Sequence, residues 1–409
     1  MTKICSFKAI RPVRDKVQLV ATKPYYSYKK NILNAKLESN PFTFLHIINP
    51  EFGSPQKTKP NSRERFELVK KGYEKFINKN ILFQEDEPKI YYYKQTKDGH
   101  EFGGVIAGAS VEEYNEGLIK KHEATITSRE NIFINYLDIV GYNAEPVLLT
   151  HEPNPSLDKL LKEITKKRPE YEYSTTDEIK HELWVINKQD NKLINEAFEK
   201  IPKVYIADGH HRCASSSGLF NKNTEVETFK NESYFLAFFM DERQIKILEF
   251  NRLVNTLNGM TKNDFIEKLS AIGDVEEMKN GRKPYLEHEF TFYLKNSWYS
   301  LKLKPHLIPK NDPVNSLDTA LLTNLILTPL LEIKDLKTDE RISFVSGEES
   351  IDKIISKVDK DENNIAFLLF PITMNQIKKV ADQNQIMPPK STWIEPKLRS
   401  GLTIYPIKE

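Results

Sequence analysis

Residues 204–220 read Val-Tyr-Ile-Ala-Asp-Gly-His-His-Arg-Cys-Ala-Ser-Ser-Ser-Gly-Leu-Phe, and the fold prediction starts from this stretch. The apolar run predicts a buried strand that ends near Asp208, and Gly209 allows a sharp turn that a ligand can approach closely. The following residues predict the start of a helix, whose first backbone N–H groups favour an anion. The order of strand, turn and helix predicts an α/β protein.

The side chains of this turn suit phosphate chemistry. Arg212 carries a planar fork that matches phosphate oxygens, and His210 and His211 add two imidazoles. Asp208 can act as a base or hold a metal. Asp-Gly is also a common surface turn, so the pattern leaves an anion site and an ordinary turn equally open. Zinc is disfavoured, because adjacent residues do not converge on one ion and no Cys or His cluster lies nearby in the sequence.

Composition predicts a soluble globular protein with no preference for a charged partner. The chain has 409 residues, of which 39% are hydrophobic and 29% charged, and its net charge is +2. Lys and Glu are interspersed, which argues against nucleic-acid binding. Cys5 and Cys213 are the two cysteines, which favours a reducing compartment. No apolar run reaches membrane-spanning length and no signal peptide is visible, so we expect a cytoplasmic protein without a membrane partner.

Hydrophobic periodicity predicts mixed sheets with covering helices along the chain. This periodicity predicts a strand at 43–48, a helix at 63–77, a helix from 111 to 118 that continues towards Glu123, hairpins at 234–250 and 287–303, and a helix at 316–327. We expect three regions: an N-terminal α/β region at 1–120, a catalytic core at 121–260, and a C-terminal α/β region at 261–409 whose loop 387–398 completes the site.

A second candidate segment is Lys121-His122-Glu123. Lys121 and His122 could hold phosphate while Glu123 takes a proton. A solvated ion pair on a helix face explains the same pattern.

A third segment combines Lys390-Ser391-Thr392 with Lys397, whose ammonium and hydroxyl donors suit an oxyanion. A solvated tail is the alternative. Arg11, Arg14 and Lys23 form a weaker basic group. The sequence contains no Walker loop, no dinucleotide-binding glycine pattern and no Gly-x-Ser-x-Gly elbow, so an anion site here would not use a common nucleotide loop.

Four segments in the order 44–51, 117–125, 205–212 and 387–398 resemble the family of pyrophosphate-dependent L-serine kinases. The Asp-Gly-His-His-Arg turn resembles the phosphate-binding turn of the ParB/sulfiredoxin-like superfamily, which includes free-serine kinases. The chain departs from the family pattern at Pro24-Tyr25-Tyr26, because an Asp is expected where Tyr26 stands.

The resemblance implies a ParB/sulfiredoxin-like core that moves a phosphoryl group from pyrophosphate to free L-serine, giving O-phospho-L-serine and phosphate, with Mg²⁺ as cofactor. Run backwards, the reaction would complete serine biosynthesis. Asp208 or Glu123 would accept the serine proton. The phosphates would be held by Gly209, His210, His211, Arg212, Lys121, His122, Lys390, Ser391, Thr392 and Lys397. Three alternatives stay open: an ADP- or ATP-dependent free-serine kinase, a ParB-like nucleotide- or DNA-binding module, and a non-catalytic metabolite-binding protein.

Overall fold

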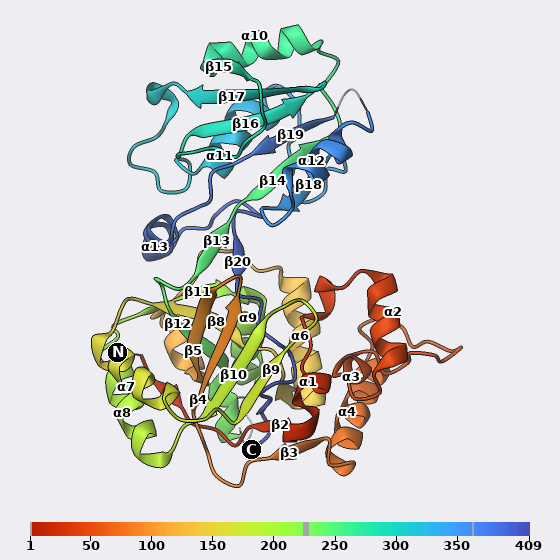
Figure 1. Ribbon diagram of the computed structural model, residues 1–409, viewed down its shortest axis with the longest axis vertical. Coiled ribbons are helices and arrows are strands. Elements are labelled where there is room, and N and C mark those ends of the chain that lie inside the picture. The colour runs from red at the N-terminus through yellow and green to blue at the C-terminus, as the bar shows by residue number, and fades with distance from the viewer. Residues whose placement is uncertain (1, 224–228, 362–363) are drawn as a thin grey trace. The chain divides into compact units, whose positions relative to one another are not determined.

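A computed structural model describes residues 2–223, 229–361 and 364–409. The chain forms two compact units: unit 1 comprises Met1–Ile245 and Pro396–Glu409, and unit 2 comprises Lys246–Glu395 (Figure 1). Each unit combines sheets with helices, so the mixed α/β class expected from the sequence is confirmed. Within the described residues, no helix has both the length and the apolar character needed to cross a bilayer.

A nine-stranded sheet forms the centre of unit 1. Eight strands lie in the order β6 (Ile119–Lys120), β11 (Val204–Asp208), β8 (Val147–His151), β12 (Tyr234–Asp241), β5 (His100–Ser110), β4 (Tyr91–Lys97), β10 (Lys180–Val185) and β9 (Tyr171–Ser174), and β1 (Ile4–Cys5) pairs with β5. Strand β11 runs parallel to β6 and antiparallel to β8. These two pairings determine which segments flank Asp208.

The two faces of this sheet differ, because alternate side chains of a strand point to opposite faces. One face is apolar and packs through a buried cluster that includes Leu149 and Phe239. The helices that contribute side chains to that cluster are α5 (Val111–Asn115), α7 (Pro155–Thr165), α8 (Lys188–Phe198) and α9 (His210–Asn223), from which Cys213 enters it. The opposite face carries buried polar side chains from three strands, namely Gln95, Thr150 and His181. Buried polar groups need partners, and this face leads to the candidate site.

The remaining elements of unit 1 come from the N-terminal part, the segment around α9 and the C-terminal segment. The helices are α1 (Val17–Val20), α2 (Lys30–Ser39), α3 (Leu45–Ile48), α4 (Arg63–Asn78), α6 (Thr127–Val140) and α9 (His210–Asn223), with short turns η1 (Arg14–Lys16), η2 (Tyr25–Ser27) and η3 (Lys230–Ser233). Two small ladders pair β2 (Ile10–Pro12) with β3 (Leu82–Gln84), and β21 (Tyr405–Pro406) with β7 (Tyr142–Asn143).

Unit 2 contains a six-stranded sheet in the order β15 (Gly273–Met278), β17 (Ser297–Leu303), β16 (Glu289–Leu294), β19 (Ile365–Leu368), β14 (Phe250–Val254) and β18 (Ile342–Ser346). A separate ladder pairs β13 (Lys246–Leu248) with β20 (Trp393–Glu395). The helical elements are α10 (Lys262–Ile272), η4 (Pro305–Leu307), α11 (Asp318–Leu322), the π-helical turn η5 (Thr323–Leu327), α12 (Ile351–Val358) and α13 (Met374–Asp382).

The helices expected at 63–77 and 316–327 and the hairpin at 287–303 are confirmed. The strand expected at 43–48 is wrong, because Leu45–Ile48 forms α3 with Leu45 and Ile47 buried. A short apolar run does not distinguish a strand from a buried helical turn.

The helix expected from 111 to 118 ends at Asn115. Gly117 adopts a φ of +75° and donates to the carbonyl of Tyr114, after which β6 begins. Lys121-His122-Glu123 therefore follows a strand.

The hairpin expected at 234–250 is also wrong, since Lys246–Leu248 pairs with β20 instead of β12. A partner so distant in the sequence leaves no local signal. The compact units also differ from the expected three regions. Strands from both sides of residue 120 share one sheet, unit 2 begins at Lys246, and Pro396–Glu409 belongs to unit 1.

Candidate active site

The turn between β11 and α9 forms the centre of the candidate site. Gly209 adopts a φ of +106°, and a Cβ atom at this position would lie 2.9 Å from Nε of Arg212. An L-residue would be strained in this conformation and would also crowd the guanidinium. The glycine thus allows Arg212 to fold back over the turn towards Asp208.

Arg212 joins two carboxylates. Its Nη2 lies 2.6 Å from Oδ2 of Asp208, and its Nη1 lies 2.8 Å from Oε1 of Glu145 and donates to the carbonyl of Pro146 at 2.7 Å. The register explains this contact, because Asp208 pairs with Leu148 and so lies beside the segment that enters β8. The guanidinium of Arg212, which we expected to bind phosphate, therefore already binds two carboxylates and a backbone carbonyl of the protein.

Lys397 reaches Asp208 from the C-terminal segment of unit 1. Its Nζ lies 3.6 Å from Oδ1 of Asp208, and its backbone carbonyl accepts a hydrogen bond from Gln95 at 3.4 Å. Although burial alone raises the pKa of Asp208, the cations of Lys397 and Arg212 outweigh it and lower that pKa. Burial raises the pKa of Glu145, against the opposing effect of Arg212. We call Asp208, Glu145, Arg212 and Lys397 the Asp208 cluster.

A second group lies on the other side of Gly209. Strand β6 runs parallel to β11, with Lys120 beside Tyr205, so the residues that follow both strands meet at one edge of the sheet. Nδ1 of His210 lies 3.3 Å from Oε2 of Glu123, and the His210 and His122 rings meet edge to face at 4.6 Å between centroids. We call His122, Glu123 and His210 the His122 cluster.

His122 is the most enclosed member of this cluster. Its ring is fully buried, and neither ring nitrogen has a hydrogen-bond partner among the described residues. Burial, together with the neighbouring His210, lowers the pKa of His122 to about 3. A neutral imidazole of this kind offers a phosphate no positive charge.

The other expected phosphate ligands have different surroundings. Lys121 is exposed, with its Nζ 5.7 Å from the centroid of the Tyr114 ring. The His211 ring is partly exposed, and burial followed by the charge of Arg129 lowers its pKa. The contacts of these two side chains are thus with Tyr114 and Arg129, which lie outside the Asp208 cluster.

Lys390, Ser391 and Thr392 belong to unit 2. Lys390 is exposed with a φ of +55°, and Oγ of Ser391 donates to the carbonyl of Pro388 at 2.7 Å. Thr392 is buried. That these residues join the Asp208 turn stays a prediction.

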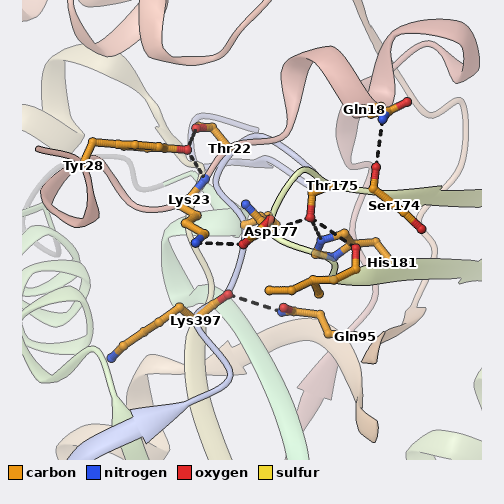
Figure 2. A network of polar contacts seen from close by, with 12 residues as sticks. Gln18, Thr22, Lys23, Tyr28, Gln95, Ser174, Thr175, Asp177, His181 and Lys397 are labelled. Atoms are coloured by element: carbon orange, nitrogen blue, oxygen red, sulfur yellow. Dashed lines mark hydrogen bonds and ion pairs between the residues drawn. The ribbon is translucent and has the colours of Figure 1, made fainter. Parts of the chain in front are cut away.

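A third network in unit 1 includes residues that the sequence analysis did not select (Figure 2). Asp177 is held by Lys23 Nζ at 2.8 Å and by Nη2 of Arg399 at 3.2 Å. Arg399 also donates to Thr175, whose hydroxyl lies 3.3 Å from Nε2 of His181. Although burial alone raises the pKa of Asp177, its contacts, with Lys23 foremost, lower it well below the usual range. Lys23 belongs to the weak basic group of the sequence, and we call these residues the Asp177 network.

Glu145 and Arg399 had weak sequence signals. Glu145 precedes Pro146 at the start of an apolar strand, which is a common surface pattern. Arg399 lies two residues beyond Lys397, on the segment that connects the Asp208 cluster with the Asp177 network. An alternation of cations at 397 and 399 after a buried strand is the signal that could have identified it.

Asp208 fits poorly as a Mg²⁺ ligand. Mg²⁺ takes oxygen ligands, usually one or two carboxylates together with water and substrate phosphates. One oxygen of Asp208 accepts from Arg212 and the other faces Lys397, so both oxygens are already paired with cations. The His122 cluster offers two imidazoles and one carboxylate, a donor set that does not suit Mg²⁺.

Solved structures similar to the chain include SbnI, a free serine kinase and a protein from Pyrococcus furiosus. SbnI with C-terminal truncation from Staphylococcus aureus is 11% identical, with a TM-score of 0.38 over 73% of this chain and 85% of that one. A free serine kinase in complex with AMP is 12% identical, with a TM-score of 0.35 over 75% and 91%. A conserved hypothetical protein from Pyrococcus furiosus is 14% identical, with a TM-score of 0.34 over 76% and 97%. Likenesses of this size leave the function open.

No curated protein matches the sequence. The family described as "Protein of unknown function (DUF1015)" matches residues 4–320, which is well over half of the chain. This match covers the Asp208 turn, Glu145, the His122 cluster and a large part of unit 2. The chain therefore belongs to the DUF1015 family.

Proposed function

We propose that the protein transfers a phosphoryl group from pyrophosphate to the hydroxyl of free L-serine. The observation that carries the proposal is the Asp208 cluster, in which an ionised carboxylate lies between Arg212 and Lys397 at the start of a long helix. Phosphoryl transfer needs positioning and charge stabilisation, with little covalent help from the protein. The four-segment resemblance to pyrophosphate-dependent L-serine kinases supports the choice of substrates.

In this proposal Asp208 is the base. The serine hydroxyl attacks the terminal phosphorus of pyrophosphate, and its proton passes to Asp208. The new O–P bond forms as the bridging O–P bond breaks, and phosphate leaves with the bridging oxygen. The ammonium of Lys397 lies 3.6 Å from Asp208 and would offset the charge that gathers on the phosphates. Arg212 acts as a positioning residue, because its fork holds Asp208 and Glu145 in fixed relation.

Mg²⁺ enters this scheme with the substrate. Magnesium binds phosphate oxygens and keeps much of its water, so it arrives as the magnesium complex of pyrophosphate. The cation neutralises charge on the diphosphate when bound.

The test is a donor and acceptor panel. The purified chain is incubated with Mg²⁺, each of the common amino acids, and pyrophosphate, ADP or ATP in separate reactions, and phosphoamino acids are measured by mass spectrometry. We expect phosphoserine with pyrophosphate well above that with ADP or ATP, and pyrophosphate from phosphoserine plus phosphate. Equal or faster turnover with a nucleotide overturns the donor assignment and leaves the kinase standing. Absence of phosphoserine with every donor overturns both.

A further inference from the structure

The His122 ring has no hydrogen-bond partner in the part of the chain that the structure describes. It is fully buried, and both ring nitrogens are without partners. Most buried polar side-chain atoms in proteins have a partner, and an unpaired one destabilises the fold. A buried, neutral imidazole of this kind is ready to act as a ligand, because it has no proton to lose at the nitrogen that coordinates.

Two further ligand groups converge on this ring. One ligand atom each from His122, Glu123 and His210 can be chosen so that all three lie within 4.8 Å of one another. The parallel pairing of β6 with β11 produces this convergence, since the three residues follow the ends of neighbouring strands. Glu123 is 41% exposed, which gives an ion a route in from solvent.

A proton shared between His210 and Glu123 would account for the contact between these two side chains, but not for the buried His122 ring. The backbone N–H of His122 donates to Nε2 of His210 at 3.4 Å, which leaves a proton on Nδ1 that faces Glu123 at 3.3 Å. An ion at Nδ1 would take the place of that proton, the ring proton would move to Nε2, and the long hydrogen bond from the His122 N–H would be given up. With the shared proton alone, the His122 ring nitrogens have no partner, whereas a metal ion could coordinate all three side chains.

We propose that His122, Glu123 and His210 bind a divalent transition metal ion of the Zn²⁺ type. Two imidazole nitrogens and one carboxylate oxygen are a donor set for zinc and its first-row neighbours, and three protein ligands leave a coordination position open. Glu123 is then a metal ligand, which leaves Asp208 as the base of the proposed reaction. The metal site does not depend on that reaction.

The test is direct metal binding by the full chain. Protein stripped with a chelator is titrated with Zn²⁺ and, separately, Mg²⁺ by calorimetry, and Co²⁺ serves as the spectroscopic probe. We expect about one Zn²⁺ per chain, visible Co²⁺ bands typical of mixed nitrogen and oxygen ligands, and no binding of Mg²⁺ in the same range. His122→Ala and Glu123→Gln should each weaken Zn²⁺ binding by at least about 10-fold, the lower bound for even indirect supporting residues.

Two variants keep the test decisive. Glu123→Gln changes a partly exposed side chain, so it reports on binding if His122→Ala does not fold. His46→Ala is the matched control, because His46 is a partly buried histidine that contacts the carbonyl of Asn40 in the N-terminal part of unit 1. Zn²⁺ binding that is absent from the wild type, or equally strong in the wild type and Glu123→Gln, overturns the metal site. Phosphoserine formation is measured separately, so either proposal can fail alone.

Discussion

The two sides of the Gly209 turn satisfy their polar groups in opposite ways. In the Asp208 cluster each charged group meets an opposite charge, and Arg212 contacts two carboxylates. In the His122 cluster a fully buried ring has no hydrogen-bond partner among the described residues. A saturated network fixes the position and charge of its members, which suits a base. An unsaturated group indicates a missing ligand.

Asp208→Asn tests the saturated side with the largest expected effect. The change preserves shape and removes the charge, and we expect turnover to phosphoserine to fall by about two to four powers of ten, the usual range for a general base. The melting temperature should change little, because Arg212 keeps Glu145. The measurement is phosphoserine formation at saturating substrates. Near-normal turnover would remove Asp208 from the base role.

Gly209→Ala tests whether the turn itself holds the Asp208 cluster together. The added Cβ would lie 2.9 Å from Arg212 at a φ of +106°, so the strain is about 1–3 kcal/mol and the guanidinium must shift. We expect turnover to fall by about 10- to 100-fold for 1.4–2.8 kcal/mol of lost positioning. Gly99→Ala is the matched control, since Gly99 has a φ of +75° with nothing within 4 Å of the added atom. If Gly99→Ala lowers turnover equally, the loss of turnover in Gly209→Ala does not come from the geometry of the Gly209 turn.

The sequence predicts those parts of the fold that depend on local pattern. The helix at 63–77 carries its own cap, since Ser62 accepts from the N–H of Arg65, and its apolar face is continuous. The failures depend on distant partners. Lys246–Leu248 forms a strand, as expected, but its neighbour is Trp393–Glu395, and only the folded chain shows this pairing. The helix that ends at Asn115 shows a missed local signal, because Gly117 marks its end.

In the candidate site, too, the sequence predicts the local features and misses the partners that are distant in the chain. Asp208, Gly209 and Arg212 are adjacent in sequence, and their types indicate a functional turn. Their partners could not be deduced from spacing: Glu145 arrives through the register of β8, and Lys397 through the return of the C-terminal segment to unit 1. Zinc is disfavoured when only neighbours in the sequence are considered. In the folded chain, however, β6 places His122 beside His210.

Lys397→Met tests how much the cations tune the base. Lys397 and Arg212 lower the pKa of Asp208, so removal of one ammonium raises that pKa. A base must be deprotonated to act, and the acid limb of the pH–rate profile should therefore move to higher pH, by about one unit for a cation at this distance. Lys222→Met is the control, because Lys222 pairs with Asp138 away from the turn. An acid limb that does not move would mean that Asp208 is not the group that titrates.

Asp177→Asn examines the Asp177 network, for which we propose a structural role. The pKa of Asp177 is lower in the folded protein than in the unfolded chain, so the ion pair stabilises the fold at neutral pH, and this contribution is lost as pH falls below about 4. The substitution leaves the buried Arg399 with less compensation, and we expect the free energy of unfolding at pH 7 to fall by about 1–3 kcal/mol.

Denaturant unfolding of the wild type and Asp177→Asn at pH 7 and at lower pH measures this difference, which should shrink as the solution becomes acidic. Turnover per folded molecule should change less than in any variant of the Asp208 cluster, because Lys397 keeps its place beside Asp208. If Asp177→Asn instead keeps the wild-type stability and lowers turnover as much as Asp208→Asn, the Asp177 network is part of the chemistry. The saturated cluster would then extend along the C-terminal segment from Lys397 to Arg399.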